Sequence, residues 1–160
     1  MKTIARLSAC LTLALVAGCS SFHEKWSAAG QPGKFQNASR WEGRWTSAHH
    51  KTPAGNPAGG RLRCVIEPVN DARILAHFHA NWLAFSADYS VPFDAKIPRT
   101  GKRGAPVEFR GTHALPKTFG GVYRYDARIS GDRFTARYAS SYDAGIFEMT
   151  RLLTNAAPFH

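Results

Sequence analysis

The stretch VYRYDARISGDRFTARYA, residues 122–139, decides the fold. Apolar and polar residues alternate strictly on both sides of a Gly131-Asp132 pair. Such alternation places every second side chain on one face of a β-strand. The short Gly-Asp link is typical of a hairpin between antiparallel strands. The stretch therefore predicts a hairpin with one apolar face, which is formed by Tyr123, Tyr125, Ala127, Ile129, Phe134, Ala136 and Tyr138.

Similar alternating runs continue on both sides of this hairpin. Turn-forming residues separate them, and the further strands are expected over residues 44–50, 61–68, 74–81, 85–93, 107–111 and 147–151. No stretch has the helical period that the crossover connections of a parallel sheet need. We therefore expect an all-β fold of about eight antiparallel strands. An up-and-down barrel would hide the strand edges, and a β-sandwich is the alternative.

Residues near the two ends of the expected sheet carry a resemblance. Gly43 and Trp45 open the first strand as Gly-x-Trp, and Arg151 lies in the last strand. This pattern resembles the lipocalin/calycin superfamily, in which an Arg packs over the Trp and closes one end of the barrel. The resemblance implies that Trp45 and Arg151 form this barrel-closing pair. A flat guanidinium can stack on an indole and still donate hydrogen bonds.

The N-terminal residues have the layout of a secretory signal. Basic residues within the first six positions precede an apolar run over residues 7–17. This run is shorter than the roughly 20 residues of a membrane-spanning helix. It ends in LVAGCS, residues 15–20, which resembles the lipobox of bacterial lipoproteins. The resemblance implies cleavage before Cys19, diacylglycerol on the Cys19 sulfur, and acylation, such as palmitate, of the new N-terminus.

The chain is thus expected to have three parts. Residues 1–18 are a signal peptide, and residues 19–40 are a lipidated N-terminus and a flexible tether, since Gly, Pro, Ser and polar residues dominate there. Residues 41–160 form the barrel domain. We expect a lipid anchor in the cell envelope and, if the host is Gram-negative, on the outer membrane facing the periplasm. Cys64 is then a lone thiol on an apolar strand face, and we expect it to be buried.

The charge balance indicates the class of partner. The chain has 21 Lys and Arg against 11 Asp and Glu. Outside the cytoplasm nucleic acid is not an expected partner, whereas anionic lipid, lipopolysaccharide or peptidoglycan are. The outer face of the hairpin offers a candidate patch for them, formed by Arg124, Arg128, Arg133 and Arg137. The alternative is a basic surface that only keeps a monomeric domain soluble.

The sequence contains few residues in a pattern typical of catalysis or metal binding. His77 and His79 lie on one face of an expected strand, about 7 Å apart, and are weak candidates for a metal site. Solvated strand histidines are the alternative. No nucleophile or zinc motif occurs, and the carboxylates are isolated, so we expect no enzyme and no cofactor. The sequence predicts a membrane-anchored barrel with a binding or structural role. The alternative is an envelope enzyme, or a metal-binding protein that uses these histidines.

Overall fold

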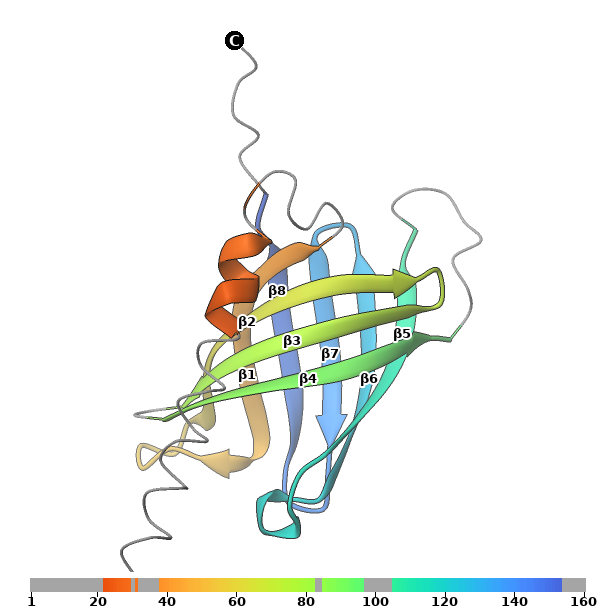
Figure 1. Cartoon of the computed structure of the whole chain (residues 1–160). Helices are drawn as coiled ribbons and strands as arrows, with labels where there is room; N and C mark the ends of the chain where they lie inside the picture. The colour runs from red at the N-terminus through yellow and green to blue at the C-terminus, as the bar shows by residue number, and fades with distance from the viewer. Residues whose placement is uncertain (1–21, 30, 32–37, 83–84, 97–104, 154–160) are drawn as a thin grey trace, which may run out of the picture.

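The sheet forms a closed barrel. The computed structural model describes residues 22–29, 31, 38–82, 85–96 and 105–153. Each strand pairs antiparallel with the next, and the last pairs with the first (Figure 1). This confirms the predicted up-and-down barrel of eight strands over the sandwich. The strands are β1 (Ser39–Lys51), β2 (Pro57–Asn70), β3 (Arg73–Trp82), β4 (Phe85–Ala95), β5 (Val107–Ala114), β6 (Val122–Ser130), β7 (Arg133–Ala139) and β8 (Ala144–Arg151).

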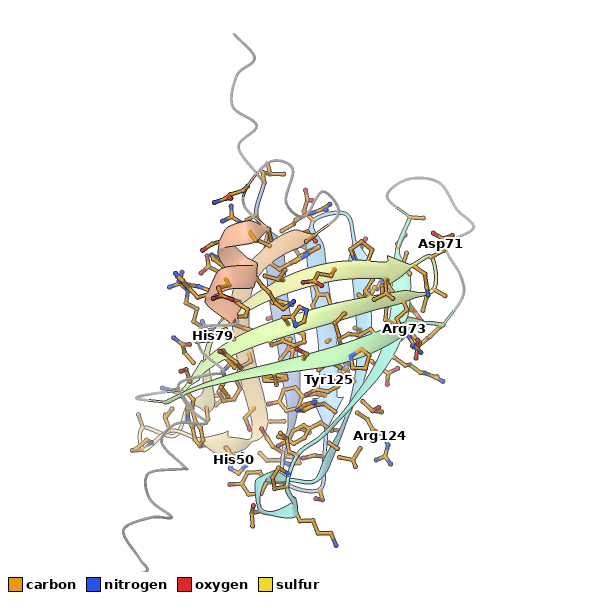
Figure 2. All side chains as sticks on the ribbon, in the orientation of Figure 1. His50, Asp71, Arg73, His79, Arg124 and Tyr125 are labelled. Carbon is orange, nitrogen blue, oxygen red and sulfur yellow. The ribbon has the colours of Figure 1, made fainter. Side chains whose placement is uncertain are left out.

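The hairpin predicted over residues 122–139 consists of β6 and β7. Ile129 lies opposite Phe134, and Gly131 adopts a φ of 58° in the turn between them. A residue without a side chain adopts this left-handed conformation without steric cost. Tyr125 points into the barrel, whereas its neighbour Arg124 points to the outside (Figure 2). The alternation in the sequence therefore corresponds to the inner and outer faces of the wall.

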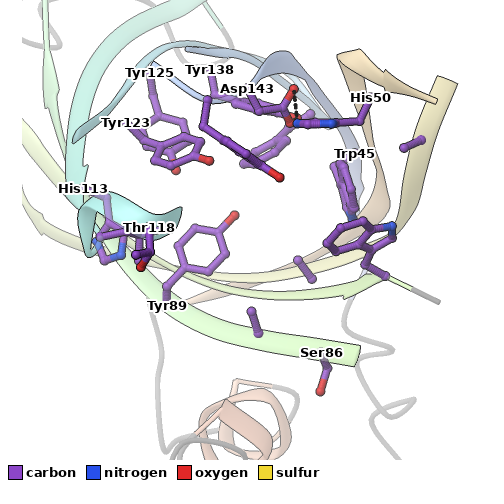
Figure 3. A pocket seen from close by; sticks show the side chains of 17 residues that line it. Trp45, His50, Ser86, Tyr89, His113, Thr118, Tyr123, Tyr125, Tyr138 and Asp143 are labelled. Atoms are coloured by element: carbon purple, nitrogen blue, oxygen red, sulfur yellow. Dashed lines mark hydrogen bonds and ion pairs between the residues drawn. The ribbon is translucent and has the colours of Figure 1, made fainter. Parts of the chain in front are cut away.

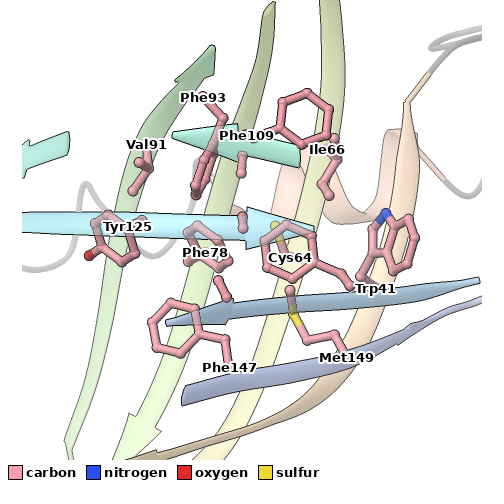
Figure 4. Packing of buried hydrophobic residues seen from close by; sticks show 14 of the residues in the cluster. Trp41, Cys64, Ile66, Phe78, Val91, Phe93, Phe109, Tyr125, Phe147 and Met149 are labelled. Carbon is pink, nitrogen blue, oxygen red and sulfur yellow. The ribbon is translucent and has the colours of Figure 1, made fainter. Parts of the chain in front are cut away.

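One half of the barrel interior is tightly packed. Phe78, Phe93 and Phe134 are fully buried, with ring centroids 6.2 to 6.5 Å apart. Figure 4 shows Cys64 among these apolar side chains, as predicted, and burial raises the pKa of its thiol. Ring pairs in edge-to-face geometry stabilise such a core beyond the area they bury. We call this half of the interior the closed half.

The seam between β1 and β8 corrects one expectation. Arg151 does not lie over Trp45; its guanidinium lies 5.8 Å from the ring centroid of Trp41. The first strand begins at Ser39, earlier than predicted, and this makes Trp41 the residue opposite Arg151. Trp41 is buried and ends the closed half, with its indole N–H donated to the Ser39 hydroxyl (2.8 Å). Trp45 lies opposite Phe147, in the other half of the barrel.

Close approach of β1 and β8 depends on a glycine. A Cβ on Gly43 would overlap the carbonyl oxygen of Glu148 across the seam. The Gly-x-Trp pattern therefore has a structural reason here, although it differs from the one inferred from the resemblance. The glycine lets the last strand close the barrel.

A short helix over residues 22–28 lies outside the barrel. Phe22, Trp26 and Ala29 form an apolar stripe at helical spacing, and this stripe covers Val65 of β2. Lys25 donates to Glu67 at 3.1 Å. Part of the expected flexible tether thus packs against the barrel, because its few apolar residues recur on one helical face. The expected signal peptide and Cys19 lie outside the described residues.

Candidate ligand-binding cavity

The second half of the barrel interior is hollow. A cavity of about 420 Å³ opens at the barrel end opposite Trp41, beside the 3₁₀ turn η1 (Lys117–Phe119) between β5 and β6 (Figure 3). The cavity exists because Ala58, Ala80 and Ala87 on β2, β3 and β4 leave space that larger residues would fill. The aromatic residues that line it are Trp45, Trp82, Tyr89, Tyr123, Tyr125, Tyr138, Tyr142 and Phe147.

A layer of rings separates the cavity from the closed half. Phe78 stacks on Tyr89, with centroids 5.3 Å apart, and lies 5.4 Å from Phe147. Phe147 in turn lies 5.9 Å from Tyr125. These four side chains come from β3, β4, β6 and β8, so the floor of the cavity is held from several sides of the barrel. A ligand in the cavity would therefore rest on a rigid aromatic surface.

The tyrosines give this apolar cavity its hydrogen-bonding groups. Burial raises the pKa of Tyr89 and of Tyr125, and the hydroxyls of both residues are neutral at physiological pH. Burial also raises the pKa of Tyr138, and its hydrogen bond to Asp143 adds to the effect. In Figure 3 the tyrosine rings point into the cavity from several strands. The cavity thus offers phenol groups that donate or accept hydrogen bonds without carrying charge.

One buried carboxylate lies in the cavity wall. Asp143 is 8% exposed, and its Oδ1 accepts hydrogen bonds from the Ser47 hydroxyl (2.6 Å) and the Ala144 amide (2.8 Å). Its Oδ2 accepts one from the Tyr138 hydroxyl (2.9 Å). The Nε2 of His50 lies 4.0 Å from Oδ1, as the dashed line in Figure 3 marks. Three donors thus fix this carboxylate at the surface of the cavity.

The residues lining the cavity carry little other charge. They include no Lys and no Arg, and Asp143 is the one acidic residue among them. Burial lowers the pKa of His113, partly offset by a hydrogen bond with the Ser90 backbone. A lowered pKa favours the neutral imidazole. The basic residues that dominate the composition therefore lie outside this cavity.

The predicted candidates His77 and His79 lie on the outer face of β3, beside the helix over residues 22–28. The Nε2 of His77 lies 3.3 Å from Glu67, and the Nδ1 of His79 lies 2.5 Å from Asp88. The Phe22 ring stacks on His79, with centroids 5.1 Å apart, so these histidines are not fully solvated. Within the described part of the chain, no group of three or more His, Cys, Asp or Glu could hold a metal.

The four arginines of the predicted patch are all exposed on the outer face of β6 and β7. Their positions are Arg124, Arg128, Arg133 and Arg137. The nearby Asp126 pairs instead with Lys96 (3.2 Å) and Arg110 (3.6 Å). None of the four has an acidic partner within 4.0 Å among the described residues. Their charge is therefore available to an external partner.

Comparison with known proteins assigns no function to this chain. Searches with protein-family models, against curated proteins and against solved structures found no match. Over the described ranges, no helix combines the length and the apolar character that crossing a membrane requires.

Proposed function

We propose that this chain is a lipid-anchored binding protein of the bacterial cell envelope, which holds one small and largely apolar molecule in its cavity. The observation that carries the proposal is the open aromatic cavity. Its volume of about 420 Å³ is typical of small-molecule sites, which span roughly 300–1,000 Å³. Apolar walls with a few fixed polar groups are also typical of such sites.

Packing energetics support a binding role over a purely structural one. A barrel selected only for stability would fill its interior, because lining atoms beside a void lose dispersion contacts. Here the closed half is filled and the other half is not, although they share the same strands. A bound apolar molecule would restore the contacts that the hollow half lacks. No nucleophile motif occurs in the sequence, and the proposal includes no catalytic step.

The anchor and the mouth of the cavity would lie close together. Three residues lead from Cys19 to Phe22 and span at most about 11 Å. Phe22 packs on His79, and β3 then runs for three residues, about 10 Å, to Trp82 at the mouth. A lipid on Cys19 would therefore hold the mouth near the membrane surface.

The rim of the mouth suits this position. Exposed apolar side chains lie at the rim, namely Trp82, Leu115 and Tyr142. Aromatic residues favour the level of the lipid headgroups, where an apolar ring and a polar edge are both satisfied. Arg124 of the basic patch lies opposite Ala139 near the same end, and we propose that it contacts anionic headgroups. The other arginines of the patch remain candidates for anionic envelope polymers.

Native mass spectrometry of the lipidated chain, extracted from its own membrane, tests the proposal. We expect a population heavier than the acylated protein by the mass of one small molecule. The control variant Ala87→Trp fills the cavity from its wall and should lose this population while keeping the barrel's circular dichroism. If the unaltered chain carries no extra mass and binds no apolar probe, the proposed function is wrong.

The anchor is tested separately. Mass spectrometry of the unaltered chain should show a mature protein that begins at Cys19 and carries acyl chains. The variant Cys19→Ser lacks the thiol that receives the lipid, so it should carry no acyl chain and keep residues 1–18. An unaltered chain without acyl chains on Cys19 would rule out the anchor without affecting the binding proposal.

A further inference from the structure

We infer that the cavity selects a molecule with an apolar body and a protonated amine, and that it rejects carboxylates such as fatty acids. This inference rests on the proposed binding function and names its ligand class. It follows from a contrast between the whole chain and the cavity. The chain has a formal net charge of +10, yet no Lys or Arg lines the cavity.

An anionic ligand would find no charged partner inside. A carboxylate that enters a water-poor site loses its hydration, and this loss must be offset by a cation or by several donors. The phenol groups supply neutral donors, but Asp143 adds a like charge to the same wall. Transfer of an acid from water into this cavity is therefore unfavourable, even though the outside of the protein is strongly basic.

Asp143 instead offers a place for an ammonium group. A carboxylate has about four acceptor positions, and three of those on Asp143 are occupied. Among the described residues, Oδ2 accepts only from Tyr138, so the remaining position is on this oxygen. Because Ser47, Ala144 and Tyr138 already fix the carboxylate, a ligand would not need to order it on binding.

The surroundings of Asp143 also favour an organic cation. Figure 3 shows Tyr138, His50 and Trp45 on the same side of the cavity as the carboxylate. Aromatic faces near a desolvated cation attract it through their quadrupoles. The Nε2 of His50 is buried and has no hydrogen-bond partner among the described residues, although it lies 4.0 Å from Oδ1 of Asp143. A metal ion fits less well, because Asp143 has no second carboxylate beside it among the lining residues.

Three matched probes test the ligand class. Phenethylamine, phenethyl alcohol and phenylpropanoate share a phenyl ring on a short alkyl spacer and differ in charge. Their affinities are measured at neutral pH by calorimetry, with the lipidated full chain in nanodiscs of zwitterionic lipid. Empty nanodiscs correct for partitioning. We expect the amine to bind about tenfold or more tightly than the alcohol, because it adds a charge-assisted hydrogen bond, and the acid to bind most weakly.

Two charge-removing variants locate the effect. Asp143→Asn should lower the affinity for the amine about tenfold or more and bring it close to that of the alcohol. Asp126→Asn removes the same charge from the outer face and should leave the preference for the amine unchanged. Circular dichroism and thermal unfolding verify the fold of each variant. The ranking on the unaltered chain does not depend on either of them.

The outcomes separate this inference from the proposed function. Binding of the acid as tightly as the amine overturns the ligand class and leaves the cavity as a binding site. A folded Asp143→Asn protein that still prefers the amine overturns the role of Asp143. If none of the probes binds and the chain extracted from its membrane carries no ligand, the proposed function fails, and this inference fails with it.

Discussion

Truncation of Phe134 tests whether the closed half is packed as described. Phe134 is fully buried, and its ring centroid lies 6.2 Å from those of Trp41 and Phe93 and 6.4 Å from that of Phe78. Replacement by Ala removes a ring that is enclosed on several sides and leaves a cavity that the barrel wall cannot collapse to fill. Phe→Ala at such sites costs about 3–5 kcal/mol, and we expect a value in the upper half of this range.

Urea unfolding, followed by tryptophan fluorescence and by far-ultraviolet circular dichroism, measures this loss in the free energy of unfolding. Total stabilities of small domains are about 5–15 kcal/mol, so the variant should unfold at a much lower urea concentration. Tyr123→Ala is the matched control, since Tyr123 is half-buried at the open cavity and its removal should cost about 1 kcal/mol. A loss near 1 kcal/mol for Phe134→Ala as well would refute the division into a packed half and a hollow half.

Three further predictions follow from burial and charge. Cys64 is fully buried with a raised thiol pKa, so it should react with a thiol reagent only after unfolding, and rapid modification of the native protein would contradict the packing. The pKa values of His77 and His113 lie below the ordinary 6.5, chiefly through burial, so as pH falls the unfolded chain takes up protons first. The free energy of unfolding should therefore decrease as pH falls below about 6.5, and His77→Gln should weaken this dependence in urea titrations at several pH values. Phe22→Ala should release the helix over residues 22–28, which limited proteolysis would detect as faster cleavage there, while the circular dichroism of the barrel is retained.

The strands could be predicted from the sequence because alternation is a local property. Tyr125, Phe134 and Ala136 were each expected on the apolar face, and all three point into the barrel. Alternation does not determine where a strand begins, since polar residues such as Ser39 and Arg40 occur both in strands and before them. The Gly-x-Trp resemblance predicted Trp45 as the partner of Arg151, whereas the structure places Trp41 there.

The candidate site could not be predicted in the same way. The inward-facing aromatic residues were recognised, but whether they fill the barrel depends on small residues across it, such as Ala80 and Ala87, and on the register of several strands. Asp143 lies between two of the expected strands and is not among the candidate site residues that the sequence indicates. Its burial depends on Ser47, which lies almost a hundred positions earlier and becomes a neighbour only when β8 closes on β1.

The helix over residues 22–28 also depends on contacts with distant residues and could not be predicted from the sequence. The composition of residues 19–40 favours a linker, and Phe22 and Trp26 form too short a stripe to predict a helix from periodicity. Its stability comes from contacts with the barrel, chiefly over Val65 and with Glu67. Short helices depend on such packing, because their own hydrogen bonds do not offset the entropy of forming them.

The most direct test of the account is a nuclear magnetic resonance titration of the full chain with phenethylamine, observed at the aromatic side chains. If the open half is a binding site, resonances of Tyr123, Tyr125 and Tyr138 should shift and saturate at one molecule per chain, while those of Phe93 and Phe134 in the closed half stay unchanged. Shifts that never saturate, or that occur only at aromatic residues outside the barrel such as Trp26, would contradict the claim that this barrel holds a ligand inside.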